Sequence, residues 1–184
     1  MGDRAAAGTG TVLRPRKLVD VSGVPVPIPN PEGFVHLQFR HFAGCPICNV
    51  DLQSIIRRHD EIVAAGIREV VVFHSSAQEL QRHVVDLPFA VVADPDKVLY
   101  AEFGVRSSAR ALLDPRAMAP VLGPTIRRLA TRGSRAPANN HPTGGRLGLP
   151  ADFLIDCGGR VIACEHGSHA YDQWSVGELL AHAR

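Results

Sequence analysis

Two cysteines, Cys45 and Cys48, have the Cys-x-x-Cys spacing of dithiols that carry out redox chemistry or bind a metal. A thiol in the first turn of a helix faces unpaired backbone N–H groups and the positive end of the helix dipole. Both favour the thiolate, and the pKa of such a thiol falls from ~8.5 into the range ~3.5–7.5. Arg40 and His41, just upstream, could add positive potential. A thiolate attacks a disulfide sulfur or a peroxide oxygen, and the second thiol then closes an intramolecular disulfide.

The residues around this pair predict a strand followed by a helix. Residues 34–42 alternate between two faces, which is a strand pattern. Pro46 suits the first helical turn, where its missing N–H removes no hydrogen bond. Apolar residues then recur at helical spacing until Gly66 ends the segment. One face of the strand has Val35, Leu37 and Phe39, and the other has His36, Gln38 and Arg40. The apolar residues at helical spacing are Leu52, Ile55, Ile56, Ile62 and Val63.

Further strands and helices follow the dithiol. Residues 69–73 and 89–93 are short apolar runs, typical of strands that are buried on both faces. A Ser-x-x-Glu capping box at residues 76–79 begins a helix that reaches about Asp86. A short helix through Phe103 follows the second of these strands. This order predicts parallel strands joined by helices.

The second half of the chain predicts a hairpin and a terminal helix. Helical signals are weak over residues 107–118, and residues 123–149 lose periodicity, as in a long surface loop. Residues 152–156 and 160–165 are two strands joined by a glycine-rich turn. A second capping box at residues 175–178 starts the last helix.

Together these elements describe an α/β fold: a thioredoxin-like sandwich whose mixed central sheet has a βαβ half, then a ββα half, and flanking helices. Residues 1–33 are rich in Gly, Pro and Ala, and the prolines of Val24–Pro29 exclude an interior strand or a helix there. We therefore expect an extended N-terminal arm over residues 1–33 and a single domain over residues 34–184.

Composition limits the classes of function. The 184 residues are 45% hydrophobic and 21% charged, as in an ordinary globular domain. A net charge of +2 gives no dedicated nucleic-acid surface. We expect no membrane span, because no apolar run is long enough to cross a membrane. We expect no secretory signal, because no apolar stretch follows the charged N-terminus. A cytoplasmic location follows, and there four cysteines are not expected to form a disulfide framework.

A zinc site is the main alternative to redox chemistry at the dithiol. Its partners would come from the tail of the chain, where the candidates are Cys157, Cys164, His166 and His169. Redox chemistry is favoured because structural zinc pairs usually lie in small loop-rich modules, whereas this pair opens an amphipathic helix. We interpret Cys157 as an exposed bystander in a turn, and Cys164 as a small core residue or a third redox thiol.

Four other residues are candidates for supporting roles. A cis peptide at Pro150 would aim backbone groups at a sulfur, whereas a trans loop proline is the ordinary alternative. Arg146 can pair with a thiolate or a peroxide oxygen, or be merely solvated. His74 follows a strand, where ligands bind in α/β sheets, or it is a satisfied structural histidine. Trp174 is expected to pack as a hydrophobic staple before the cap at Ser175.

The segment Gly123–Leu149 contains several arginines and no acidic residue. The arginines are Arg127, Arg128, Arg132, Arg135 and Arg146. Such a loop either attracts an anionic substrate to the dithiol or is solvated without further effect.

Four stretches carry a family resemblance: HLQFRHFAGCPIC at 36–48, GIREVVVFHS at 66–75, GLPADFLID at 148–156, and residues 166–180 with the run DQWS. They resemble the bacterial peroxiredoxin-like proteins of the alkyl hydroperoxide reductase/thiol-specific antioxidant group. The resemblance covers about residues 34–182 and implies the thioredoxin fold.

The resemblance implies two assignments of the attacking thiol. The peroxiredoxin motif Pro-x-x-x-Thr-x-x-Cys falls on His41, Cys45 and Cys48, so Cys48 is similar to the peroxidatic cysteine. Arg146 then stands near the place of the arginine that precedes the late strand. Thioredoxins carry Cys-x-x-Cys and a cis-proline before the late strand, positions that Cys45, Cys48 and Pro150 match. In that version Cys45 attacks.

We therefore expect a thiol-dependent oxidoreductase that reduces peroxides or disulfides through Cys45 and Cys48, supported by Pro46, Pro150 and Arg146, without a bound cofactor or metal. Its expected partners are the substrate and an external reductant, either a thioredoxin-type protein or a low-molecular-weight thiol, with a homodimer as a further expectation. Nucleic acid and membrane are not expected partners. The alternatives are a non-redox binding module for a metal or small molecule and a specialised pathway enzyme that acts on one small molecule.

Overall fold

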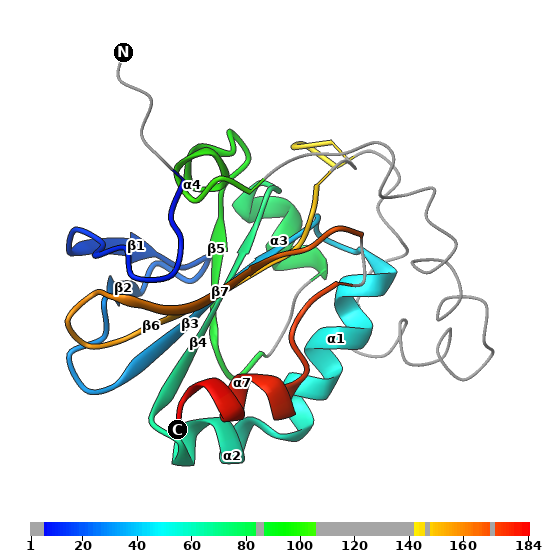
Figure 1. Ribbon diagram of the computed structural model, residues 1–184. Coiled ribbons are helices and arrows are strands. Elements are labelled where there is room, and N and C mark those ends of the chain that lie inside the picture. Colours follow the sequence, from blue (N-terminus) through cyan, green and yellow to red (C-terminus); the bar gives the residue numbers. More distant parts are fainter. Residues whose placement is uncertain (1–5, 84–86, 106–141, 146–147, 170–171) are drawn as a thin grey trace.

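A five-stranded mixed sheet forms the centre of the computed structural model, which describes residues 6–83, 87–105, 142–145, 148–169 and 172–184. The strand order is β5-β4-β3-β6-β7 (Figure 1). β3, β4 and β5 are parallel, β6 is antiparallel to β3, and β6 and β7 form an antiparallel hairpin. The strands are β3 (Phe34–Arg40), β4 (Ile67–Phe73), β5 (Ala90–Ala93), β6 (Ala151–Ile155) and β7 (Val161–His166). The expected fold class is confirmed.

The described helices flank this sheet. They are α1 (Pro46–Arg57), α2 (His59–Ala64), α3 (Ala77–His83), α4 (Val98–Glu102) and α7 (Val176–His182). The single helical segment expected between Pro46 and Gly66 is in fact two helices, because the backbone of Arg58 leaves the helical conformation, with φ −114° and ψ 18°. No glycine or proline marks this break in the sequence. Gly66 ends the second helix with φ +73°, as expected.

The two faces of the sheet bury different cores. Val35, Leu37 and Phe39 of β3 pack with α4 and the N-terminal residues. The opposite face meets α1, α2, α3 and α7, whose apolar side chains form the second core. In Figure 1, α1, α2 and α7 lie on one side of the sheet, and α4 lies with β1 and β2 on the other. The dithiol is on the α1 side.

The N-terminal segment contains a short hairpin that the sequence pattern did not reveal. β1 (Arg16–Val19) pairs with β2 (Pro25–Ile28) in an antiparallel two-stranded sheet. Among the described residues β2 pairs with β1 alone, which suits a strand whose prolines lack N–H donors. The side chains of Leu13, Val26 and Ile28 are buried in the first core.

Both predicted capping boxes lie at helix starts. Ser175 and Glu178 form the complete reciprocal box at α7. At α3, the Ser76 hydroxyl accepts from the backbone N–H of Glu79 at 3.3 Å, whereas the Glu79 carboxylate accepts from the backbone N–H of Thr143 at 3.1 Å.

Some expectations lie outside the described residues. They include the weak helix over 107–118, most of the loop Gly123–Leu149, and its arginines Arg127, Arg128, Arg132, Arg135 and Arg146. Among the helices that the structure describes, none is long and apolar enough to cross a membrane.

Candidate active site

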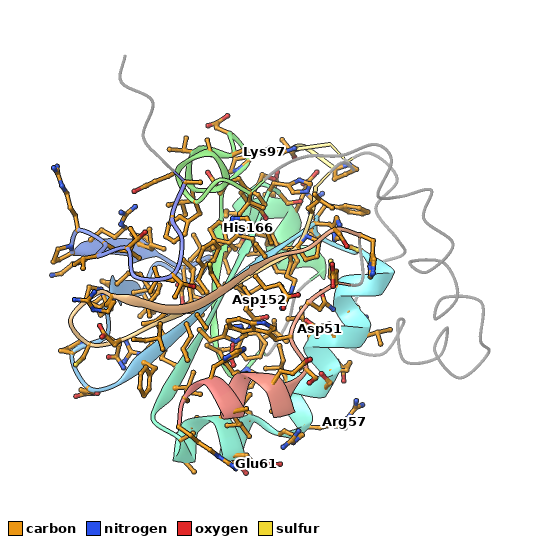
Figure 2. The ribbon with its side chains drawn as sticks, viewed as in Figure 1. Asp51, Arg57, Glu61, Lys97, Asp152 and His166 are labelled. Atoms are coloured by element: carbon orange, nitrogen blue, oxygen red, sulfur yellow. The ribbon has the colours of Figure 1, made fainter. Side chains whose placement is uncertain are left out.

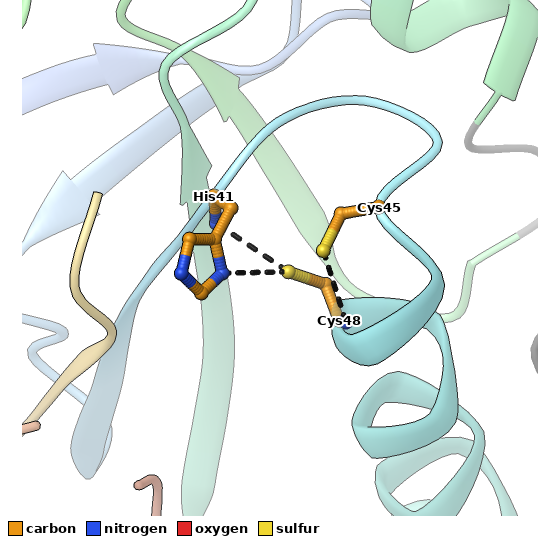
Figure 3. Close-up of side chains that lie close together, drawn as sticks. All are labelled: His41, Cys45 and Cys48. Atoms are coloured by element: carbon orange, nitrogen blue, oxygen red, sulfur yellow. Dashed lines mark hydrogen bonds between the residues drawn. The ribbon is translucent and has the colours of Figure 1, made fainter. Parts of the chain in front are cut away.

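Cys45 caps the N-terminus of α1. Its Sγ accepts a hydrogen bond from the backbone N–H of Cys48 at 3.4 Å, and Pro46 lies in the first turn (Figure 3). Gly44 precedes the cap with φ +81°, a conformation that favours glycine. The sequence therefore places one sulfur of the dithiol against an unpaired N–H at the positive end of the helix.

Cys48 lies one helical turn further on and contacts His41, the residue that follows β3. The Cys48 Sγ is 3.2 Å from His41 Nδ1 and accepts a hydrogen bond from the His41 backbone N–H at 3.4 Å (Figure 3). Both cysteines are free and buried, with exposed fractions of 6% for Cys45 and 1% for Cys48. Cys45 is therefore the slightly more accessible thiol.

The two sulfurs differ in their tendency to ionise. The hydrogen bond from Cys48 lowers the pKa of Cys45 well below its usual range, against the opposing effect of burial, and His41 lowers it further. Burial raises the pKa of Cys48 well above its usual range, and the adjacent Cys45 raises it further. The arrangement therefore favours a thiolate at Cys45 that is paired with a thiol at Cys48.

A buried network of charged side chains lies next to the dithiol. Arg40, at the end of β3, donates to Asp51 of α1 at 3.1 Å and to Asp152 of β6 at 2.9 Å. His36 lies between two carboxylates, 2.9 Å from Glu69 of β4 and 3.0 Å from Asp152. Figure 2 shows Asp51 and Asp152 in the interior between α1 and the sheet. The network thus joins three neighbouring strands to the helix that carries the dithiol.

Further hydrogen bonds satisfy this network. The Gln38 side chain accepts from Arg40 at 2.7 Å and donates to Glu69. The backbone N–H of Trp174 donates to Asp152 at 3.2 Å, and the indole stacks on the His36 ring with centroids 5.7 Å apart. Buried charges are tolerated where they are paired and hydrogen-bonded in this way.

The network shifts the pKa values of its members. Burial alone lowers the pKa of His36, but Glu69 and Asp152 outweigh it and raise the value to about 9. Burial raises the pKa of Asp152, but Arg40 and His36 lower it to about 2. For Asp51 burial prevails over Arg40 and raises the pKa to about 6. His36 and Asp152 are therefore an ion pair at neutral pH.

This network is not evident from the strand pattern, which places His36, Gln38 and Arg40 on one face of β3 but does not show what that face contacts. The available signal was an acidic residue in each strand that neighbours β3, Glu69 in β4 and Asp152 in β6, next to the polar face of β3. On a sheet that helices cover, such residues must pair with one another.

His74 is a second residue beside the site. Its side chain is buried, and neither ring nitrogen has a hydrogen-bond partner among the described residues. Burial lowers the pKa of His74 to about 3, so the ring is neutral. A Cβ at Gly148 would lie 2.9 Å from His74 Nε2 and 3.7 Å from His41 Cδ2, so this glycine lets the backbone pass beside both rings. Both interpretations of His74, a ligand-binding residue at the strand end and a structural histidine, stay predictions.

Pro150 is not a cis-proline in this structure. The one cis peptide bond in the described part of the chain is Ile28–Pro29, so the bond before Pro150 is trans. The Pro150 carbonyl accepts from the Gly167 N–H at 2.9 Å, which continues the contact between the two hairpin strands. Its ring lines a cavity of about 410 Å³ together with His166. Arg146, the other supporting candidate, lies outside the described residues.

The tail residues do not join the dithiol. Cys157 is exposed, Cys164 is partly buried and lies 3.5 Å from the Thr9 hydroxyl, and His166 lies 3.0 Å from the Phe103 carbonyl oxygen. Among the described residues, the three donors that meet are His41, Cys45 and Cys48. A zinc site that combines the dithiol with the tail is therefore excluded by the geometry of the described residues.

A family model for the AhpC/TSA antioxidant enzymes matches residues 54–169, which is more than half of the chain. The chain belongs to the AhpC/TSA antioxidant enzyme family. The match begins after Cys48, so the dithiol lies just before the matched residues. No curated protein sequence matches the chain.

Solved structures share the fold of this AhpC/TSA member. Peroxidoxin BcpB from Mycobacterium tuberculosis has a TM-score of 0.63 at 17% identity, with 96% of each chain covered. The bacterioferritin comigratory protein of Xanthomonas campestris has a TM-score of 0.62 at 14% identity, covering 99% of this chain and 100% of its own. A chain assigned as the thiol:disulfide interchange protein DsbE of Chlorobium tepidum has a TM-score of 0.58 at 18% identity, covering 98% and 100%.

Membership of the AhpC/TSA family makes this protein a thiol-dependent oxidoreductase, and its fold is that of the thioredoxin-like solved structures. The expectations of its fold, of its family and of its general class of chemistry are thereby confirmed.

Proposed function

We propose that the protein reduces a peroxide or disulfide bond with Cys45 as the attacking thiol and Cys48 as the resolving thiol. This proposal rests on the position of the Cys45 sulfur at the N-cap of α1, where the sulfur accepts a hydrogen bond from the backbone N–H of Cys48 at 3.4 Å. This contact and the helix dipole stabilise negative charge on that sulfur. The position favours the thioredoxin-like assignment over attack by Cys48.

The reaction balances for either substrate class. With a hydroperoxide, the Cys45 thiolate takes the terminal oxygen, the O–O bond breaks, and the leaving alkoxide is protonated to an alcohol. The Cys48 thiol then attacks the sulfenic acid at Cys45 and expels water. With a disulfide, Cys45 forms a mixed disulfide and releases one thiol, and Cys48 releases the second. Both routes end with a Cys45–Cys48 disulfide.

An external dithiol or two monothiols must then reduce that disulfide. We propose a thioredoxin-type protein or a low-molecular-weight thiol as the electron donor, which suits a reducing cytoplasmic setting. A homodimer is part of the same proposal, and sedimentation of the reduced protein tests it.

The experiment that tests the cysteine roles uses Cys45→Ser and Cys48→Ser, with Cys157→Ser as the matched control. Peroxide consumption and protein-disulfide reduction are followed separately, each with an excess of thiol reductant. We expect Cys45→Ser to lose both activities. In a single turnover without added thiol, Cys48→Ser should be trapped at Cys45, as a sulfenic acid with a peroxide or as a mixed disulfide with a disulfide substrate, and Cys157→Ser should match the wild type in both assays. Trapping at Cys48 in the Cys45→Ser protein would overturn the assignment.

A further inference from the structure

Three ligand atoms of soft or borderline character meet at the start of α1. One ring nitrogen of His41 and the sulfurs of Cys45 and Cys48 all lie within 4.8 Å of one another, and the three residues are buried. In Figure 3 the His41 ring and the Cys45 sulfur approach the Cys48 sulfur from different directions. His41 reaches the site from the end of β3, so the cluster is built from two separate elements.

The spacing of these atoms is close to that of a metal coordination shell. Metal–sulfur bonds of about 2.3 Å and metal–nitrogen bonds of about 2.0–2.1 Å place the ligand atoms of a tetrahedral or trigonal site about 3.5–4.0 Å apart. His41 Nδ1 and Cys48 Sγ are 3.2 Å apart. This pair is therefore within a few tenths of an ångström of coordination spacing, and all three ligand atoms lie within 4.8 Å of one another.

The donor set also selects the class of metal. Two thiolates and one imidazole favour Zn²⁺ or Cu⁺ over oxygen-preferring ions such as Mg²⁺ and Ca²⁺. Three protein ligands leave a fourth position open to water or a thiol, as in catalytic rather than structural zinc sites. No ligand from the tail of the chain is required, unlike in the zinc site that the sequence pattern raised.

We propose that the reduced protein binds one thiophilic metal ion, Zn²⁺ or Cu⁺, through His41 Nδ1, Cys45 Sγ and Cys48 Sγ. Binding displaces the protons that the two thiols still hold and transfers no electrons. Because a Cys45–Cys48 disulfide removes both sulfur ligands, metal binding and oxidation of the dithiol exclude each other. The ion would thus hold the dithiol in a reduced, inactive form.

The test is a titration of the reduced, metal-free, full-length protein under anaerobic conditions. Zn²⁺ and Cu⁺ are added separately in competition with a chromophoric chelator. We expect one equivalent of at least one of these ions to bind, and no binding after the Cys45–Cys48 disulfide has formed. Failure of both ions to bind stoichiometrically to the folded, reduced protein would overturn the proposal.

The role of His41 separates this site from a bare dithiol. His41→Asn should weaken metal affinity on the order of 10–100-fold. The matched controls are His166→Gln and Cys157→Ser, whose side chains lie outside the cluster and should leave the affinity unchanged. Equal affinity of the wild type and His41→Asn would show metal binding by the cysteines alone and would overturn the three-ligand site.

X-ray absorption of the zinc-loaded or copper-loaded wild type tests whether His41 is a metal ligand without the use of any variant. We expect two sulfur ligands and one imidazole in the first coordination sphere. A sphere without imidazole would refute the assignment even if His41→Asn failed to fold. The proposal is independent of which substrate the enzyme reduces, because none of these readouts uses turnover.

Discussion

Asp51 of α1 accepts a hydrogen bond at 3.1 Å from Arg40 of β3, so a buried ion pair joins the strand before the dithiol to the helix that carries it. Asp51 follows Cys48 by three residues, which places the two on neighbouring positions of one helix face. The same guanidinium contacts Asp152 at 2.9 Å. The pair therefore fixes the orientation of α1, and with it the sulfurs, relative to the sheet.

Replacing Arg40 with Met should destabilise the protein strongly. The change leaves the buried Asp51 carboxylate without its cation and leaves Asp152 with His36 alone. We expect the free energy of unfolding to fall by about 3–5 kcal/mol, as when one partner of a buried ion pair is removed. Urea denaturation of the reduced protein measures this loss.

The matched control is Arg58→Met, which breaks the pair between Arg58 and Glu61. That pair is exposed, with 41% of the Arg58 side chain and 55% of the Glu61 side chain accessible. Its loss should leave the free energy of unfolding nearly unchanged, because solvent-exposed ion pairs contribute little to stability. Equal losses in Arg40→Met and Arg58→Met would contradict the buried network.

The pH dependence of stability should report on His36. Its pKa is about 9 in the folded protein, against a usual value of about 6.5. A raised pKa contributes stability that is fully present below pH 6.5 and is lost as the pH rises toward 9. We expect the free energy of unfolding to fall between these values by an amount on the order of 3 kcal/mol.

The measurement compares urea midpoints at pH 6.5 and 9 in a Cys45→Ser/Cys48→Ser background, so that thiol ionisation does not contribute. The groups that face His36 are Glu69 from β4, Asp152 from β6 and the indole of Trp174. The Asp152 carboxylate, with a pKa of about 2, stays ionised throughout this range. A His36→Gln variant should show a flatter profile, and an equally steep one would assign the effect to other groups.

Sequence patterns were sufficient for the fold because each element has a local signal. The alternation of β3, the capping box of α7 and the proline after Cys45 each predict an element that the structure contains. The break at Arg58 has no such signal, because it lies between two segments that share one apolar pattern. The β1–β2 hairpin was missed because its prolines argue against a strand and only its edge position permits them.

The dithiol could be predicted from spacing alone, whereas its surroundings could not. Cys45 and Cys48 are neighbours in the sequence, but Glu69 and Asp152 reach the network from strands that are far apart in the chain. Their partners depend on strand order and register, which no local pattern contains. The same is true of His74, whose buried environment depends on Gly148.

Replacing His74 with Phe should leave the protein at least as stable as the wild type. Both ring nitrogens are buried without a hydrogen-bond partner among the described residues, which costs about 1–3 kcal/mol in the resting protein. An apolar ring of similar shape removes that cost and keeps the contact with Tyr100, whose ring centroid is 5.6 Å away. We expect a gain of about 1 kcal/mol in thermal or urea unfolding.

The control for this variant is His36→Phe, which removes an imidazole that contacts a carboxylate through each ring nitrogen. His36→Phe should lose several kcal/mol, because it leaves the buried Glu69 without its cation and removes one of the two cations that contact Asp152. If His74→Phe is destabilised to the same extent, then His74 has a structural hydrogen-bond partner and our description of its surroundings is wrong.

The last prediction separates the structural role of Cys45 from its chemistry. As the N-cap of α1, its side chain accepts the Cys48 N–H. Serine retains an acceptor at this position and alanine does not, so Cys45→Ala should be about 1 kcal/mol less stable than Cys45→Ser. Ser175→Ala removes the N-cap of α7 and shows how much unfolding free energy is lost with an N-cap in the same protein. Equal unfolding free energies for the two Cys45 variants, alongside a measurable loss in Ser175→Ala, would show that the Cys45 sulfur does not cap α1. With the expected difference, the loss of activity in the well-capped Cys45→Ser protein can be attributed to the missing thiol rather than to a frayed helix.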